Sequence, residues 1–292
     1  MASISRGGAT IAYDLRTPAS SAAGPTGAVP RTVVLLHNIF TDRRIFDHAA
    51  AELCRHGVQT VAVDFRGHGA SAACGVARYG IDDLVGDVLA VLDHEGIGRA
   101  AIAGVSLGAS VALELALAHP DRVDGLILMG VDAEPDGGFP AVRNALFCRL
   151  VGLVGMRWFV LSGVIATIFG AWFRAEGHER FAAWRARVAA MPPGLARRAM
   201  EAWTGRRSRL GALSSLQMPA QVVVGDEDVS CPLPCGQKVQ RALPGATLVR
   251  LAHAGHTMPA ERPAEVAAAL VAFLLALPVP VAKAPGRASG RD

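Results

Sequence analysis

Short apolar runs and longer amphipathic segments alternate along most of the chain. The apolar runs are continuous, which is typical of parallel strands buried on both faces; they occupy residues 32–36, 60–63, 100–103, 126–129, 221–224 and 247–249. The segments between them have helical spacing and occupy residues 46–56, 81–94, 109–119, 235–242 and 264–276. Strands and helices in this rhythm predict an α/β fold with a mostly parallel sheet and helices on both of its faces.

The alternation stops after Asp132, and the residues that follow have no strand pattern. We therefore predict an α/β core made of residues 1–132 and 213–277, interrupted by an inserted helical lid at 133–212. The last residues, 278–292, are rich in Pro, Gly and basic residues, and we expect them to form a disordered tail.

The most apolar part of the predicted lid is 158–173, a run of 16 residues without a charge. A membrane-spanning helix needs about 20 apolar residues, and Arg149 and Arg157 interrupt the longer run. We therefore predict no transmembrane segment. Helices that pack on the core and line an apolar pocket explain the run better, and peripheral lipid contact stays open.

Composition and charge exclude several classes of function. The net charge is +4, and no basic run is interleaved with aromatic residues, so we expect no nucleic-acid partner. The five cysteines are scattered and have no accompanying histidine cluster, which predicts no metal site and indicates a reducing compartment. Residues 1–14 alternate like a strand and carry no secretory signal, so we predict a cytoplasmic protein. The oligomeric state is left open.

The strongest candidate for chemistry is Ser106, in the run Gly104-Val105-Ser106-Leu107-Gly108 between a predicted strand and a predicted helix. This context is typical of a nucleophile elbow, in which the serine stands on a sharp turn. The turn closes only if the residues two positions to either side are small, and both are glycine.

A serine hydroxyl needs an adjacent general base, and the base needs an acid that orients it. His256 lies on a loop after the last predicted strand, where it can reach Ser106, whereas His253 at the strand end suits a structural role. The acid predicted here is Asp228, which follows the run 221–224; Asp132 is the alternative. The order Ser…Asp…His is that of an α/β-hydrolase.

An oxyanion hole needs two backbone N–H groups that point at the developing negative charge. Leu107 follows the nucleophile at a helix amino terminus, and its N–H is the first predicted donor. The second predicted donor is the N–H of Ile39, in the loop after the run 32–36.

Together these residues resemble the α/β-hydrolase superfamily, over about residues 31–132 and 218–275. The resembling motifs are the elbow, the His-Asn loop at 37–38, the DxRGxGxS turn at 64–71, the acid loop at 225–228 and the histidine loop at 254–256. Within the superfamily the chain is similar to small cofactor-free esterases, perhydrolases and oxoadipate enol-lactonases. The resemblance implies a serine hydrolase that needs no cofactor.

The chain departs from the family at Asn38, which stands where the family usually has glycine. Because Asn tolerates a positive φ better than most residues, we expect the oxyanion turn to survive. Its side chain is a candidate substrate contact.

Arg43 and Arg44 follow this loop and are candidates for holding a substrate carboxylate, although pairing with nearby aspartates is the more common role. Trp158 and Phe159 are candidates for the wall of the substrate pocket.

The predicted reaction is hydrolysis of a carboxylic ester with a small to medium hydrophobic group, through an acyl-enzyme. One alternative is a lactonase or carbon–carbon bond hydrolase that uses the same triad. Another, from a different class, is a hydrolase-fold receptor that binds a ligand with little turnover. The sequence does not decide the natural substrate.

Overall fold

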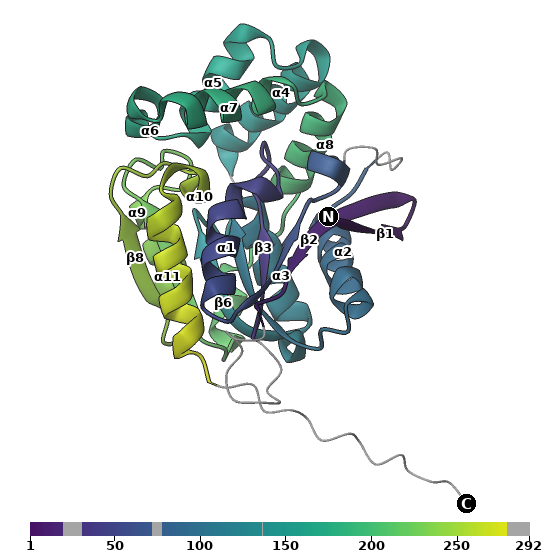
Figure 1. Ribbon diagram of the computed structural model, residues 1–292. Helices are drawn as coiled ribbons and strands as arrows, with labels where there is room; N and C mark the ends of the chain where they lie inside the picture. Colours follow the sequence, from purple (N-terminus) through teal and green to yellow (C-terminus); the bar gives the residue numbers. More distant parts are fainter. Residues whose placement is uncertain (20–30, 72–77, 136, 279–292) are drawn as a thin grey trace, which may run out of the picture.

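The computed structural model describes residues 1–19, 31–71, 78–135 and 137–278, and these ranges contain one eight-stranded sheet (Figure 1). The strand order is β1-β2-β4-β3-β5-β6-β7-β8. The pairs β1–β2 and β2–β4 are antiparallel, and all the other neighbours are parallel. The strands are β1 (Ala2–Arg6), β2 (Ala9–Arg16), β3 (Thr32–Leu36), β4 (Gln59–Val63), β5 (Ala100–Val105), β6 (Val123–Met129), β7 (Ala220–Gly225) and β8 (Thr247–Leu251).

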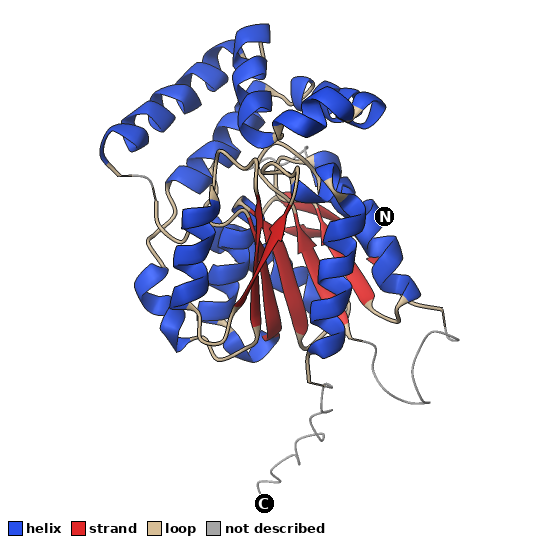
Figure 2. Cartoon of the chain, turned by 90° about the vertical axis from the view of Figure 1, so that its left-hand side faces the viewer, coloured by secondary structure: helices blue, strands red, loops and turns tan. Residues whose placement is uncertain are grey.

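Helices cover both faces of this sheet, which confirms the predicted α/β architecture (Figure 2). Helices α1 and α11 share one apolar cluster with the sheet, and α2, α3 and α9 share the other. The helices of the core are α1 (Asp47–Arg55), α2 (Ile81–His94), α3 (Leu107–Ala118), α9 (Leu233–Ala242), α10 (Met258–Glu261) and α11 (Pro263–Ala276).

Between β6 and β7 the chain leaves the sheet and forms a helical insert, α4–α8, as the sequence pattern predicts. Its helices are α4 (Gly138–Val154), α5 (Trp158–Ile168), α6 (Ala171–Glu176), α7 (His178–Ala189) and α8 (Pro193–Thr204). The insert lies above the end of the sheet at which the parallel strands finish (Figures 1 and 2). The division into core and lid at 132/133 and 212/213 stays a prediction. Within the described ranges, no helix is both long and apolar enough to cross a bilayer.

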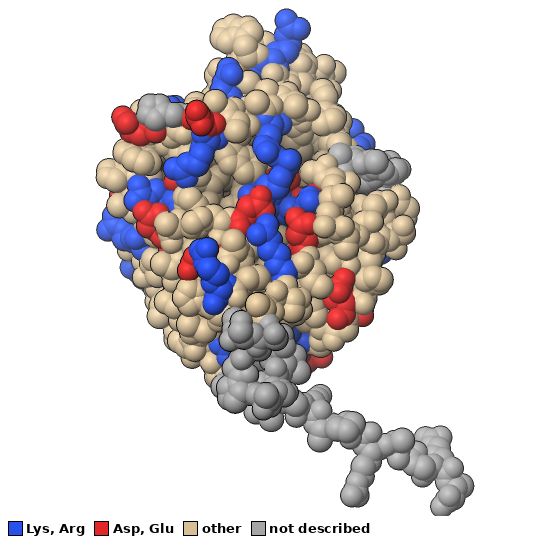
Figure 3. Space-filling view, in the orientation of Figure 1, with Lys and Arg blue, Asp and Glu red and all other residues tan. Residues whose placement is uncertain are grey.

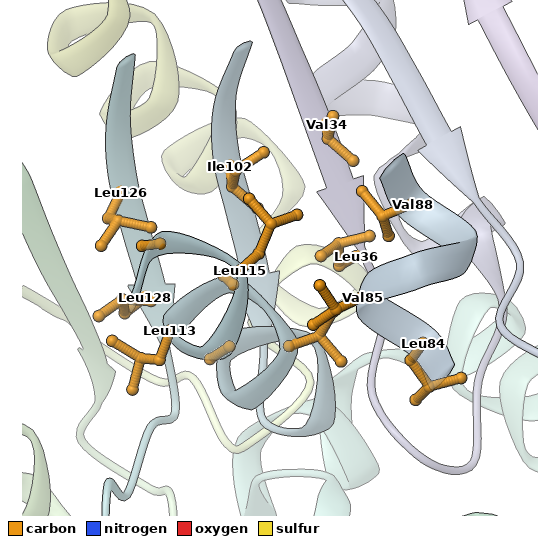
Figure 4. Close-up of a cluster of buried hydrophobic side chains, with 14 of the residues drawn as sticks. Val34, Leu36, Leu84, Val85, Val88, Ile102, Leu113, Leu115, Leu126 and Leu128 are labelled. Atoms are coloured by element: carbon orange, nitrogen blue, oxygen red, sulfur yellow. The ribbon is translucent and has the colours of Figure 1, made fainter. Parts of the chain in front are cut away.

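Alternation within single strands builds the two layers of the core. In β3, Val34 and Leu36 face α2 and α3, whereas Val33 and Leu35 face α1, and all four are fully buried. Figure 4 shows the first of these layers, in which side chains of β3, β5 and β6 pack against α2 and α3. A parallel sheet is stable only when both faces are covered in this way.

Two details of the chain ends differ from the sequence prediction or fall outside the described residues. The first 14 residues were predicted as one strand but form two, β1 and β2, because Gly7 and Gly8 take positive φ values of 54° and 76° and turn the chain back. The predicted tail falls almost entirely outside the described residues, which end at 278.

Candidate active site

Ser106 stands between the end of β5 and the first residue of α3, with φ 53° and ψ −107°. An L-residue in this region is strained by about 1–3 kcal/mol, and such strain persists only where the surrounding structure imposes it. Among the described residues, only one other non-glycine, His253, has a positive φ. The backbone N–H of Ser106 donates to the Met129 carbonyl oxygen at 2.9 Å, which ties the turn to β6.

The two glycines of the elbow are required by close backbone approach. A Cβ at Gly108 would lie 2.2 Å from the carbonyl oxygen of Leu36 in β3. A Cβ at Gly104 would lie 2.3 Å from the carbonyl carbon of Gly108. Any side chain at either position would push α3 away from the sheet and open the turn that presents Ser106.

His256 and Asp228 form a buried pair beside this turn. The imidazole Nδ1 lies 2.9 Å from Asp228 Oδ2, and both residues are about 95% buried. The other carboxylate oxygen, Oδ1, accepts the backbone N–H groups of Ser230 at 2.9 Å and Cys231 at 2.8 Å. Burial alone would lower the pKa of His256, but the charge and hydrogen bond of Asp228 outweigh it, so the pKa lies above its usual value.

The two competing residues of the sequence analysis have other contacts. Asp132 Oδ1 accepts the backbone N–H of Glu134 at 3.0 Å, and its carboxylate also bonds the Cys235 thiol. His253 is more than half exposed and faces Glu227 at 3.6 Å. The structure therefore pairs His256 with Asp228 and not with Asp132.

One residue that the sequence analysis missed shapes this pair. Gly130 directly follows β6 with φ 53°, and a Cβ there would lie 3.0 Å from His256 Nδ1 and 3.1 Å from Asp228 Oδ2. Such contacts are tighter than normal van der Waals separation, so the bare backbone of Gly130 makes room for the imidazole–carboxylate contact. A lone glycine after a strand carries no recognisable motif, which is why sequence reasoning passed over it.

Two buried imidazoles hold the loop after β3 through hydrogen bonds. His37 Nδ1 donates to the Asn38 carbonyl at 2.7 Å, and its Nε2 accepts the Phe65 N–H at 3.0 Å. Burial lowers the pKa of His37 to about 4, so the ring is neutral with its proton on Nδ1. His68 bonds the carbonyl oxygen of Ile39 from the same side.

The backbone of Asn38 differs from the prediction, while its place as a candidate substrate contact stays a prediction. Its φ is not positive, so tolerance of a left-handed turn does not explain it. The buried amide donates from Nδ2 to Thr257 Oγ1 at 2.9 Å and accepts the Thr41 hydroxyl. Thr257 Oγ1 donates in turn to the Ile168 carbonyl at 2.9 Å, at the end of α5. The Asn38 side chain thus links the loop after β3 to the residue after His256 and to the helical insert.

Glu261 holds the loop that carries His256 through backbone hydrogen bonds. Its carboxylate accepts three backbone N–H groups, from Gly170 at 2.9 Å, Gly255 at 2.8 Å and Thr257 at 2.9 Å. Burial raises the pKa of this carboxyl to about 7 despite these bonds. The loop that carries His256 is therefore pinned both to the core and to the insert.

A pocket of about 490 Å³ joins these parts. Its floor comes from the core loops and includes Ser106, His256, Asn38 and Ile39, and Leu107 is buried directly beside Ser106. The wall comes from the insert and from the loop after β7; it consists of Arg143, Asn144, Phe147, Gly163, Val164, Thr167, Ile168, Met200, Trp203, Val229, Ser230 and Cys231, with Phe40 from the core. The sequence analysis did not identify this wall.

The structure does not bring the predicted carboxylate-binding arginines to the pocket. Arg43 is buried and donates from Nε to Asp14 at 2.8 Å and from its guanidinium to Asp64. Arg44 is paired with Asp42. Both arginines are thus engaged in ion pairs. The prediction that Arg43 contacts the substrate is therefore wrong.

Trp158 and Phe159 are likewise absent from the pocket wall. They begin α5, 76% and 43% exposed, and contact each other edge to face with ring centroids 5.7 Å apart. The face of α5 that lines the pocket carries Gly163, Val164 and Thr167 instead. In the part of the chain that the structure describes, no group of three or more His, Cys, Asp or Glu side chains is placed to hold a metal ion.

Comparison with known proteins agrees with this geometry. Residues 33–269 match the model of the alpha/beta hydrolase family. The protein "Putative carbamate hydrolase RutD" of Variovorax paradoxus is 31% identical over 237 residues, which cover 78% of this chain and 85% of that protein.

Solved structures agree with this assignment. The enol-lactonase of Burkholderia xenovorans is 26% identical with a TM-score of 0.81, over 94% of this chain and all of that one. A thermophilic esterase of Thermogutta terrifontis superposes with a TM-score of 0.82 at 24% identity, over 91% of this chain and 93% of that one, and shares the fold. The chain belongs to the alpha/beta hydrolase family.

Proposed function

We propose that the protein is a serine hydrolase that cleaves carboxylic esters of small to medium hydrophobic groups through an acyl-enzyme. The observation that carries the proposal is the shared pocket: Ser106, on a strained turn, and His256, paired with Asp228, line the same cavity of about 490 Å³. A cavity of this size holds a small organic molecule.

In the proposed reaction Ser106 Oγ attacks the ester carbonyl carbon, and His256 Nε2 takes the hydroxyl proton. The N–H groups of Ile39 and Leu107 stabilise the oxyanion of the tetrahedral intermediate. When the intermediate collapses, the carbon–oxygen bond to the alcohol breaks and His256 protonates the leaving alcohol. Water then attacks the acyl-enzyme with the same base, which releases the acid and restores Ser106. Asp228 keeps the imidazole proton on Nδ1, so that Nε2 is free to accept.

The test is hydrolysis of p-nitrophenyl esters from acetyl to decanoyl, with Ser106→Ala as the variant. The matched control is Ser110→Ala, one turn further along α3, where the hydroxyl bonds only the Ser106 carbonyl at 3.3 Å. We expect Ser106→Ala to lower kcat by at least about three orders of magnitude and Ser110→Ala to lower it little. A folded wild type that is inert on every ester contradicts the proposal.

A lactone is the second candidate substrate, and Arg143 favours it. Arg143 lines the pocket from α4, and within the described residues no carboxylate pairs with it. A lactone that carries a carboxylate would therefore meet a cation, and the relative from Burkholderia is named an enol-lactonase. If this is right, Arg143→Gln raises KM for an anionic lactone about tenfold and leaves KM for a neutral ester unchanged. Equal changes in both values contradict it. Tight binding of ester or lactone without turnover would favour a ligand-binding receptor.

A further inference from the structure

The outer side of the insert exposes large apolar side chains along one line of α4. Phe139 is 78% exposed, Val142 58%, Leu146 58%, Leu150 38% and Leu153 84%. At about 100° per residue these five positions fall within about 80° of the helix circumference. We call these five residues the α4 stripe. A monomeric soluble protein rarely leaves such a row of apolar side chains in water.

The opposite side of α4 is buried and serves the pocket. Cys148 and Val151 lie in the apolar cluster of the insert, and Asn144 and Phe147 line the cavity that holds Ser106. The helix packs against α8 on this buried side. Since α4 already has its contact with the protein, the stripe is a second apolar face that packing within the described chain does not use.

Cations border the stripe on both sides. On the same helical projection Arg149 and Arg143 each lie about 20° beyond an edge of the stripe. Arg157 follows in the link to α5, where Trp158, 76% exposed, continues the apolar surface. The sequence from residue 137 to residue 175 contains four arginines and no Asp or Glu. Figure 3 shows uncharged and basic atoms at the uppermost part of the molecule, whereas acidic side chains lie at the left of the insert and lower on the same face.

This combination selects among possible occupants. A second copy docked through the same face would bring the arginines of both copies toward each other at the rim of an apolar contact, where like charges repel. An anionic membrane surface instead accepts the apolar side chains into its acyl boundary, while the arginines extend to the headgroups.

We propose that the α4 stripe, with Trp158, Arg149 and Arg157, is a membrane-docking surface for bilayers that contain anionic lipids. The helix lies in the plane of the interface and does not span it, in agreement with its length and with the absence of a spanning helix among the described residues. Because α4 also forms a wall of the pocket, docking holds the cavity next to the bilayer.

The experiment is co-sedimentation of the full chain with vesicles of phosphatidylcholine alone and of phosphatidylcholine with 30% phosphatidylglycerol. We expect binding to the anionic vesicles that falls as salt is raised. Leu153→Ser with Trp158→Ser should lower the partition coefficient at least about tenfold. Arg149→Gln with Arg157→Gln should lower it about 25-fold on anionic vesicles and little on neutral ones.

Matched controls are Leu275→Ser, which removes an apolar side chain 57% exposed on α11, and Arg241→Gln on α9. Neither should change vesicle binding, and all these variants should keep wild-type hydrolysis of a soluble ester. Failure of the wild type to bind anionic vesicles overturns the proposal. So does a dimer in sedimentation equilibrium that Leu153→Ser with Trp158→Ser dissociates, because the stripe would then be an interface between copies. Neither outcome bears on the hydrolytic mechanism.

Discussion

Replacing Asp228 by Asn tests how Asp228 orients the imidazole of His256. Asp228 Oδ1 accepts two backbone N–H groups, at 2.9 Å and 2.8 Å, while Oδ2 faces His256 Nδ1 at 2.9 Å. An asparagine keeps its oxygen on the two backbone donors, since an NH₂ group there would face two further N–H groups. Its amide nitrogen then points at Nδ1, which must become an acceptor. The proton moves to Nε2, and the base cannot take the proton of Ser106.

The size of the effect follows from this tautomer argument. An Asp→Asn change in a serine-protease triad lowers kcat about 10⁴-fold, or about 5.4 kcal/mol of transition-state stabilisation. We expect a loss of that order for Asp228→Asn, with little change in the fold because the two backbone hydrogen bonds remain. The free energy of unfolding should fall by about 1.5–3 kcal/mol, the usual contribution of one hydrogen bond to a charged group.

The pH profile gives a second readout. The pKa of His256 lies above its usual value because Asp228 outweighs burial, so wild-type activity is lost as the pH falls through that pKa. Without the carboxylate charge, burial dominates and the pKa drops below 6.5. The residual activity of Asp228→Asn should therefore persist to lower pH than that of wild type.

The assay is kcat and kcat/KM from pH 5 to 9 on the best p-nitrophenyl ester, with Asp132→Asn as the matched control. Asp132 bonds a neighbouring backbone N–H and a thiol and does not touch His256. Its variant should keep activity within about threefold of wild type. If Asp132→Asn loses activity and Asp228→Asn keeps it, the pairing seen in the structure is not the one used in the reaction.

Three further variants test the surroundings of the site. Gly130→Ala should lower kcat about tenfold by displacing the histidine–aspartate pair. The control is Gly245→Ala, at φ 67° with nothing within 4 Å of its added Cβ, which should cost only about 1 kcal/mol of stability. Both Tm and kcat are measured for each variant. Asn38→Ala and Thr257→Val should each lower kcat more than they raise KM. Each removes the bond between the two residues and one further bond, so the double variant should lose less than the sum of the two single losses; fully additive losses contradict the link. Glu261, with its pKa raised to about 7, adds stability that is complete below pH 4.5 and is lost as the pH rises through 7. The free energy of unfolding, measured by thermal unfolding, should therefore exceed that of Glu261→Gln by about 2–3 kcal/mol less at pH 8 than at pH 5. A difference that stays constant with pH contradicts this.

The sequence predicts the parts of the site that local backbone geometry imposes. Gly104 and Gly108 can be predicted because the elbow tolerates no Cβ at either position. The strand before them and the helix after them follow from hydrophobic periodicity. His256 and Asp228 are predictable because each follows a strand, β8 or β7, and these parallel strands end at the same edge of the sheet. Local sequence therefore identifies these residues, and the order of the strands in the sheet brings them together.

The sequence does not predict contacts that depend on long-range packing. Arg43 looks like a free cation beside the oxyanion loop, but Asp14 on β2 and Asp64 after β4 bind it, and only the strand order shows that they are neighbours. Gly130 is needed because two side chains far away in the sequence converge upon it. Trp158 was assigned to the pocket from its aromatic character, whereas the side of α5 on which it stands faces outward.

The same contrast separates the proposed catalytic residues from the residues that would select a substrate. The proposed nucleophile, base and acid are placed by loops of the core, whose glycines and buried hydrogen bonds constrain the backbone closely. Most of the wall of the pocket comes from the insert, whose helices contact the core through side chains such as Phe147 and Trp203 and need only fill space. Volume-conserving apolar exchanges there cost less than about 1.5 kcal/mol, so the wall can change shape without loss of the fold. We therefore expect substrate preference to depend on α4, α5 and α8, so that exchange of their pocket residues moves the chain-length optimum of ester hydrolysis.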